Sequence, residues 1–250
     1  MKAKSLIELI ENIAPLYLAE EFDTPGLCCG SESQDVNKVL VCENVSMDVL
    51  DEAIDNNCEM IVSHHPVVFG EEIVDQFTQD IVDKAKKNKI ILYSAHTNLD
   101  STIGGINDKL CDLLKINVLG GYNTCHRLGE FEKDGTLKEK SEEIAKLLND
   151  NHIRTVGDLN KTIKTVCVSC GAGARDDELI EEIKNKNVDV VIGGENKISL
   201  AIKMKYYNVA LIEVGHYNSE IICMDIFYDM LKVSGVEIIK SKKDIDPYNK

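Results

Sequence analysis

Short apolar segments alternate with segments of helical periodicity along most of the chain. Apolar stretches of about five to seven residues predict strands, and apolar residues three and four positions apart predict helices. The predicted strands are 38–43, 59–63, 90–95, 163–169, 188–192 and 208–214. The predicted helices are 4–14, 47–57, 75–89, 105–115, 136–150, 176–186, 196–206 and 218–232. This alternation predicts an α/β fold with largely parallel strand pairing.

The same pattern divides the chain into two similar parts, approximately 1–125 and 126–250, each with several strand–helix units. No clear sequence repeat relates the parts and no low-complexity linker separates them. We therefore expect two α/β parts with mixed sheets, packed as one compact unit over residues 1–250.

Two polar stretches interrupt the alternation. The stretch GGYNTCHRLGEFEKDG, residues 120–135, is rich in turn-forming residues and predicts a loop. Thr136 and Glu139 follow it as a capping box and mark the start of a helix. The polar C-terminal stretch KSKKDIDPYNK, residues 240–250, predicts a frayed end.

Composition narrows the class of protein. Among 250 residues, 44% are hydrophobic, enough for a sizeable core, and the net charge is -15. This excess of acid disfavours a nucleic-acid surface and binding to an anionic membrane. The sequence has no apolar stretch near the roughly 18 residues of a membrane span. Nine cysteines without a secretory signal predict reduced thiols in the cytoplasm.

The candidate chemistry gathers after three predicted strands. These strands continue into the sequences HHP, AHTNLD and GHYNSE. In open α/β sheets, ligands bind at the carboxyl ends of the strands. The three sequences contribute His64, His65, His96, Asp100, His216 and Glu220.

A lone histidine at a strand end is usually a packing or hydrogen-bonding residue, but three such clusters together indicate a metal site. Imidazole suits Zn, Fe, Ni and Co, and carboxylates add Mn. These ligands are too many for one open catalytic site, but they suffice for two ions that share a bridging carboxylate or water. His126 and His152 lie in a turn and at a helix end, where local roles are expected.

Three further motifs have ordinary structural explanations. Cys167 and Cys170 form a C-x-x-C without a second copy, and Cys28 and Cys29 are adjacent, so both pairs are interpreted as buried structural cysteines. The stretch EEFDTPGLCCG, residues 20–30, predicts a turn. The stretch SCGAGARDD could approach an anion through its small residues, but it lacks a full phosphate-loop motif.

Six motifs together resemble the Nif-three-like family, also called GTP cyclohydrolase I type 2-like or dinuclear metal centre hexameric proteins. The motifs are EFDTPGLCCG, VSHHPVVF, LYSAHTNLDSTIGGINDKL, CHRLGEF, VDVVIGGE and LIEVGHYNSE, and they span almost the whole chain. The chain departs from the family pattern at Phe22, where Trp is usual, and at Thr24, where Asn is usual. After Glu195 it also lacks a frequent family histidine.

The resemblance implies a site and an assembly. His64, His65, Asp100, His216 and Glu220 match the family's ligands for two divalent ions, with Glu220 as the candidate bridge. His96 matches a residue near the ions that could act as an acid or base. The family fold has two α/β parts around mixed sheets, its members form hexameric rings or cages, and this chain matches the short form.

Two functions follow from the resemblance. The first is a metal-dependent hydrolase acting on a nucleotide such as GTP or on another small substrate. The second is a non-catalytic metal-binding assembly or regulatory module. An open coordination position that holds water would favour the enzyme, whereas full function in a ligand mutant that still assembles would favour the module.

Overall fold

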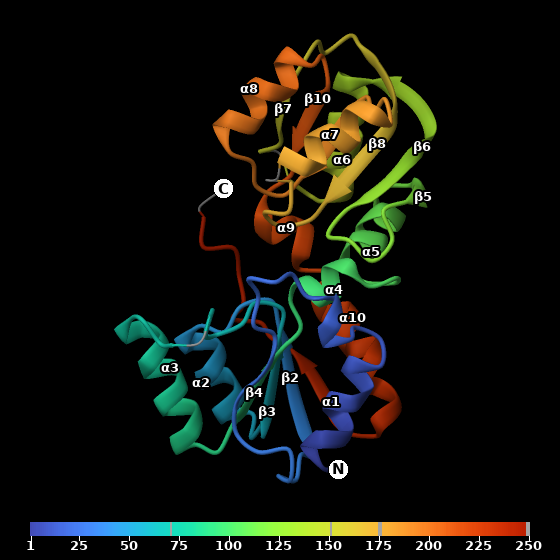
Figure 1. Ribbon diagram of the computed structural model, residues 1–250. Coiled ribbons are helices and arrows are strands. Elements are labelled where there is room, and N and C mark those ends of the chain that lie inside the picture. Colours follow the sequence, from blue (N-terminus) through green and yellow to red (C-terminus); the bar gives the residue numbers. More distant parts are fainter. Residues whose placement is uncertain (71, 151, 175–176, 249–250) are drawn as a thin grey trace. The chain divides into compact units, whose positions relative to one another are not determined.

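The strands form two separate sheets, and each sheet belongs to its own unit of the chain (Figure 1). The computed structural model describes residues 1–70, 72–150, 152–174 and 177–248. The first unit contains Met1–Gly105 and the segment that begins at Cys223, and the second contains Ile106–Ile222. The predicted α/β class with mixed sheets is confirmed. No helix in the described part of the chain has the length and apolar character needed to span a membrane.

The first unit is built on a five-stranded sheet with the order β1-β4-β3-β2-β11. Its strands are β1 (Gly26–Cys29), β2 (Lys38–Cys42), β3 (Met60–Ser63), β4 (Ile91–Ser94) and β11 (Glu237–Lys240). Its helices are α1 (Ala3–Glu11), α2 (Met47–Asp55), α3 (Gln76–Lys87), α4 (Thr97–Ser101) and α10 (Cys223–Leu231). All strand pairs are parallel except β1 with β4. Helices α1 and α10 lie on one face of this sheet, and α2 and α3 lie on the other (Figure 1).

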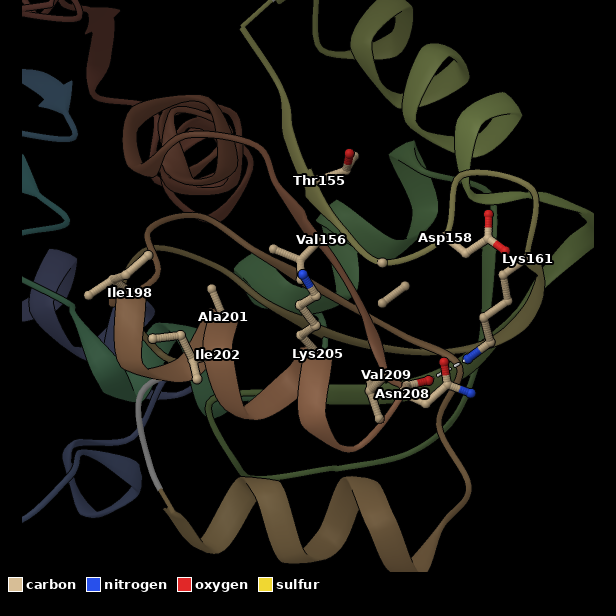
Figure 2. A pocket seen from close by; sticks show the side chains of 12 residues that line it. Thr155, Val156, Asp158, Lys161, Ile198, Ala201, Ile202, Lys205, Asn208 and Val209 are labelled. Carbon is tan, nitrogen blue, oxygen red and sulfur yellow. Dashed lines mark hydrogen bonds between the residues drawn. The ribbon is translucent and has the colours of Figure 1, made fainter.

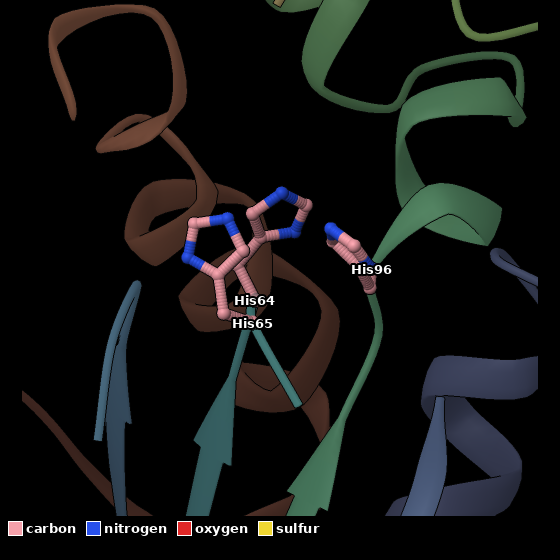
Figure 3. A group of neighbouring side chains, drawn as sticks. All are labelled: His64, His65 and His96. Atoms are coloured by element: carbon pink, nitrogen blue, oxygen red, sulfur yellow. The ribbon is translucent and has the colours of Figure 1, made fainter. Parts of the chain in front are cut away.

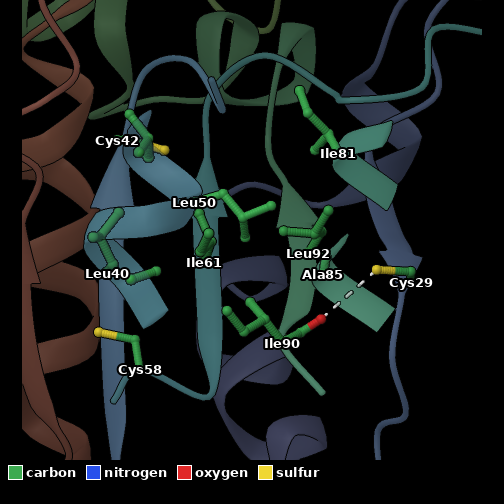
Figure 4. Packing of buried hydrophobic residues seen from close by; sticks show 12 residues of the cluster. Cys29, Leu40, Cys42, Leu50, Cys58, Ile61, Ile81, Ala85, Ile90 and Leu92 are labelled. Carbon is green, nitrogen blue, oxygen red and sulfur yellow. Dashed lines mark hydrogen bonds between the residues drawn. The ribbon is translucent and has the colours of Figure 1, made fainter. Parts of the chain in front are cut away.

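Strand periodicity explains the core between this sheet and α2 and α3. Leu40, Ile61 and Leu92 occupy matching positions on three neighbouring strands and pack against Leu50 of α2 and Ile81 of α3 (Figure 4). Each of these side chains is at most 1% exposed. Burying one such side chain contributes about 1.5–3 kcal/mol, so this layer fixes the sheet that carries the polar strand ends.

The second unit has a six-stranded sheet with the order β5-β6-β8-β9-β10-β7. Its strands are β5 (Ile116–Gly120), β6 (Arg127–Thr136), β7 (Arg154–Val156), β8 (Thr162–Ser169), β9 (Val190–Gly193) and β10 (Ala210–Glu213). Its helices are α5 (Ile106–Leu113), α6 (Leu137–Leu147), α7 (Asp177–Asn185), α8 (Ile198–Tyr206) and α9 (His216–Glu220). Residue 176, the first of one predicted helix, lies outside the described residues. Parallel pairing is confined to β8, β9 and β10, so the expectation of largely parallel pairing holds only for the first unit.

The expected loop over residues 120–135 was wrong, because most of it forms strand β6. Alternate residues of β6 are buried, but the buried positions hold Arg127 and Gly129 before Phe131. A strand whose inward positions are Arg and Gly has no apolar alternation, so the hydrophobic pattern cannot reveal it. The capping box of Thr136 and Glu139 is present at the start of α6 as predicted.

The expected frayed C-terminus was also wrong over its described part, residues 240–248. An Asp244 carboxylate oxygen accepts hydrogen bonds from the backbone N–H groups of Glu43 and Asn44. The Ser241 hydroxyl donates to Glu52 at 2.6 Å. These polar side chains anchor the segment beside β2, so a polar composition here does not mean an unattached end.

Arg127 is a fully buried cation that holds the segment between β5 and β6. Its guanidinium donates to both carboxylate oxygens of Asp108, at 2.8 and 3.1 Å. The same group donates to the carbonyl oxygens of Gly121, Thr124 and His126 at 2.8 to 2.9 Å. A buried guanidinium is tolerated only when its donors are satisfied, and this one organises the turn that enters β6.

We expect Arg127→Met to lower the free energy of unfolding by about 3–5 kcal/mol, because it leaves the Asp108 carboxylate without its buried counter-ion. Urea unfolding followed by circular dichroism measures this loss. Lys164→Met is the matched control, since Lys164 pairs with Glu130 at 3.3 Å on the exposed surface and should cost less than about 1 kcal/mol. Equal losses in the two variants would contradict the assignment of Arg127.

Candidate metal centre

The register of three parallel strands brings the first group of polar side chains together. Cys42 of β2 is level with Ser63 of β3, which is level with Ser94 of β4. Two residues beyond these matched positions, the chain carries Asn44, His65 and His96. Because parallel strands end at the same edge of a sheet, these side chains meet there, and the sequence predicts this position for the two histidines.

His64, His65 and His96 form a compact group at this edge (Figure 3). The ring centroids are 4.8 Å apart for His64 and His65, 5.1 Å for His64 and His96, and 5.3 Å for His65 and His96. One ring nitrogen from each residue lies within 4.8 Å of the other two. His64 is fully buried, and the other two rings are partly buried. Three imidazole nitrogens at this spacing can hold one divalent ion.

Oxygen acceptors fix the ring protons of all three histidines. Nδ1 of His64 is 2.9 Å from the carbonyl oxygen of Ala95, which only accepts hydrogen bonds. Nδ1 of His65 is 2.8 Å from Oδ1 of Asn44, and Nδ1 of His96 is 2.8 Å from Oδ1 of Asp23. In a neutral ring the proton therefore sits on Nδ1, and the lone pair is on Nε2. Metal-binding histidines in proteins are usually held in this way.

Asp23 orients His96 from the turn that precedes β1. Its Oδ2 also accepts from the Thr97 backbone N–H at 3.0 Å and from the Thr97 hydroxyl at 2.5 Å. Burial by itself would raise the pKa of Asp23, but the hydrogen bonds and charge of His96 and the bonds from Thr97 lower it to about 2. Asp23 is therefore ionised at neutral pH. Sequence reasoning treated Asp23 as a turn residue and missed this role, and it did not single out Asn44.

Asp100 is a second carboxylate of the first unit that lies near the histidines. It is buried in the short helix α4, and its Oδ1 is 3.7 Å from Nε2 of His64. This separation is too long for a hydrogen bond. Two ligands bound to one zinc-sized ion at about 2.1 Å each lie roughly 3.4 Å apart in tetrahedral geometry, so the observed spacing fits a shared ion.

The second unit arranges another polar group by the same kind of register. Ser169 of β8 is level with Gly193 of β9, which is level with Glu213 of β10. Beyond these positions, Nδ1 of His216 lies 3.1 Å from a carboxylate oxygen of Glu195. Nε2 of His216 is 2.9 Å from Oε2 of Glu220, which is buried four residues further along α9. The predicted pairing of these two residues on one helical turn is therefore observed.

Gly171 lets the backbone approach the Glu220 carboxylate. It has a φ of +50°, and a Cβ built on it would lie 1.8 Å from Oε1 of Glu220 and 3.2 Å from Nε2 of His216. Its N–H donates to the Ser219 hydroxyl at 2.9 Å. The small residues of the stretch that begins at Ser169 therefore leave room for an anionic group, and that group is the Glu220 carboxylate of the protein itself.

The other candidate residues have local roles. Cys167 is fully buried, and burial raises the pKa of its thiol, so it stays protonated. Cys170 is buried, and its backbone N–H donates to Asn107 at 2.9 Å. Nε2 of His126 is 3.0 Å from a Glu182 oxygen, and His152 is exposed. These residues behave as the structural interpretation expects.

We expect Gly171→Ala to weaken zinc binding by about 10- to 100-fold, because the new methyl group displaces Glu220 and His216. Zinc titration with a competing chelator measures the affinity, and thermal unfolding shows whether the fold survives. Gly235→Ala is the matched control, since Gly235 has a φ of +76° and no atom within 4 Å of the added Cβ. Unchanged zinc affinity in a folded Gly171→Ala protein would contradict the role of this glycine.

Comparison with known proteins agrees with the architecture of both units. The model of the family Duf34/NIF3 (NGG1p interacting factor 3) matches residues 1–247. A protein of Clostridium acetobutylicum named GTP cyclohydrolase 1 type 2 homolog is 32% identical over 99% of this chain and 98% of its own length. A protein of the same name from Methanocaldococcus jannaschii is 31% identical over 92% of this chain and 95% of its own length.

Solved structures show the same fold. A Bacillus cereus protein related to NIF3 superposes with a TM-score of 0.88 and 20% identity, covering 100% of this chain and 99% of its own. The structure of reduced HcgD from Methanocaldococcus jannaschii has a TM-score of 0.82 and 28% identity, covering 97% of this chain and 98% of its own. With the family model matched over nearly the whole sequence, the chain belongs to the Duf34/NIF3 family.

Proposed function

We propose that this protein is a metal-dependent hydrolase that acts on a nucleotide or a similar small substrate. The observation that carries the proposal is the group of His64, His65 and His96, whose Nδ1 atoms all face oxygen acceptors. In neutral rings this makes Nε2 the atom through which His64 and His65 could bind ions and His96 could accept a proton. Family relatives named GTP cyclohydrolase 1 type 2 homolog make GTP the first substrate to test.

In this proposal two divalent ions would be held by His64, His65, Asp100, His216 and Glu220, with Glu220 as the candidate bridge. Support comes from the chemistry of these ligands, which are imidazoles and carboxylates. The donor set suits Zn, Fe, Mn, Ni or Co.

The chain's own residues supply orientation and proton transfer. Bound ions would act as Lewis acids and make a bound water more acidic. Asp23 holds the His96 proton on Nδ1, so Nε2 of His96 can accept a proton from the attacking water and later return it to the leaving group. The water oxygen bonds to the attacked carbon or phosphorus as the leaving group departs. For the imidazole ring of GTP, one water would open the ring at C8 to a formamide, and a second water would hydrolyse that formamide and release formate.

We also propose self-association as a homohexamer in the cytoplasm. Helix α8 places Ile198, Ile202 and Tyr206 on one exposed face, at the four-residue spacing of helical neighbours. A groove of about 710 Å³ runs beside this face, lined in part by Ile198, Ile202, Lys205 and Val156 (Figure 2). An exposed apolar face of this kind supports contact with another protein surface.

The α8 face also favours the second candidate function, a non-catalytic metal-binding assembly. In that case the ions would be structural or sensory, and the apolar face would contact a partner. Consider a variant in which a proposed metal ligand is replaced but the protein still assembles. If that variant keeps the full biological role, this function is favoured over hydrolysis.

We expect His65→Ala and Glu220→Ala each to reduce the bound ions and to abolish hydrolysis, because each removes a proposed ligand. Inductively coupled plasma mass spectrometry counts the ions, and assays with GTP and phosphate esters measure turnover. His96→Asn should keep most of the bound metal but lower kcat by about 10²- to 10⁴-fold, since it removes only the proposed acid and base. Activity that survives in both His65→Ala and Glu220→Ala would disprove the site.

We expect six copies of the wild-type chain in solution when the mass is measured by light scattering. Ile202→Asp should give smaller species, because it places a charge in the centre of the exposed α8 face. Lys203→Asp, on the same helix but outside this apolar row, is the control and should leave the mass unchanged. A monomeric wild-type protein would contradict the assembly.

A further inference from the structure

Two phenylalanines lie exposed beside the histidine group of the first unit. Phe22 is 63% exposed and Phe69 is 54% exposed, and their ring centroids are 6.1 Å apart. The Phe69 ring is 6.2 Å from the His96 ring, at an interplanar angle of 75°. These two adjoining exposed rings form an apolar aromatic surface next to the candidate metal group.

Hydrogen bonds tie the two loops that carry these rings. The Thr24 hydroxyl donates to the Val68 carbonyl oxygen at 3.3 Å and accepts from the Gly70 N–H at 3.0 Å. Asp23, the residue next to Phe22, holds Nδ1 of His96. The same short turn therefore places one exposed ring and orients one site histidine, so the positions of the rings and of the histidine are coupled.

We propose that Phe22 and Phe69 form a stacking surface for a flat heteroaromatic ring of the substrate. This inference rests on the proposed hydrolase function and names its substrate class. Phenylalanine offers an apolar face and no hydrogen-bond donor or acceptor, so it recognises a ring by its face and tolerates different bases. Stacked rings usually have centroids 4.5–7 Å apart. Because Phe69 adjoins His96, a ring stacked there brings its attached groups to the histidines.

Because the chain contains no tryptophan, a single introduced tryptophan can report binding at this surface by its fluorescence. Phe22→Trp and Phe69→Trp each introduce a single fluorophore that a stacked base quenches. Each full-length, zinc-loaded variant is titrated with guanosine, with cytidine and with ribose 5-phosphate, which has no aromatic ring. Phe77→Trp is the matched control, since Phe77 lies in α3 and is 58% exposed.

We expect saturable quenching by both nucleosides at positions 22 and 69, only linear collisional quenching at position 77, and no saturable change with ribose 5-phosphate. Phe22→Leu and Phe69→Leu should each raise the guanosine Kd about 10-fold by calorimetry, because leucine keeps the apolar bulk and loses the aromatic face. Phe77→Leu should leave the Kd unchanged.

Absence of saturable quenching at both positions, or equal quenching at position 77, overturns the proposal. Leucine variants that assemble differently but bind guanosine normally would also overturn it, because they would identify a contact between copies of the chain. Nucleoside binding without turnover contradicts only the hydrolase function. Turnover of GTP that is unaffected by both leucine substitutions contradicts only the stacking surface.

Discussion

The register of parallel strands is the constraint on which both polar groups depend. In the first unit the level positions Cys42, Ser63 and Ser94 set where the chain leaves the sheet. The histidines follow within two residues of those positions, so a shift of one residue in pairing would change which side chains meet. The second unit uses the same device at the ends of β8, β9 and β10. The packing of the apolar strands therefore fixes their register, and the register determines which polar side chains meet at the strand ends.

This dependence explains why the gathering of histidines at a sheet edge could be predicted from sequence. His64, His65 and His96 follow short, continuous apolar segments that predict buried strands, so their place at a sheet edge follows from the fold class. The supporting residues carry no such signal. Asp23 and Asn44 lie in loops, and their role becomes visible only when their oxygens are found 2.8 Å from a histidine Nδ1. Long-range hydrogen bonds between loops are a property of the folded chain, which a single sequence does not encode in any local pattern.

The failed predictions have related causes. Strand β6 was missed because Arg127 and Gly129 occupy its inward positions, where the arginine is satisfied by Asp108 and three carbonyl groups. The C-terminal segment was taken as frayed because it is polar, yet Ser241 and Asp244 bond to neighbouring groups. In both cases buried polar residues with complete hydrogen bonding replaced the apolar contacts that sequence patterns detect. Gly171 is a related case. Because it has no side chain, the Glu220 carboxylate can lie against its backbone.

The net charge of the protein affects the binding of any anionic substrate. With a net charge of -15, the surface as a whole repels phosphate groups. The histidine group of the first unit lies beside the carboxylates of Asp23 and Asp100, which add to the acidic surroundings. If the substrate is a nucleotide, as proposed, its affinity would come from bound cations and from contacts that carry no charge. An aromatic face such as that of Phe22 or Phe69 supplies such a contact, because stacking is not opposed by the acidic surroundings. In the proposed hydrolase, the histidine group and the phenylalanine pair would therefore make complementary contacts with one substrate.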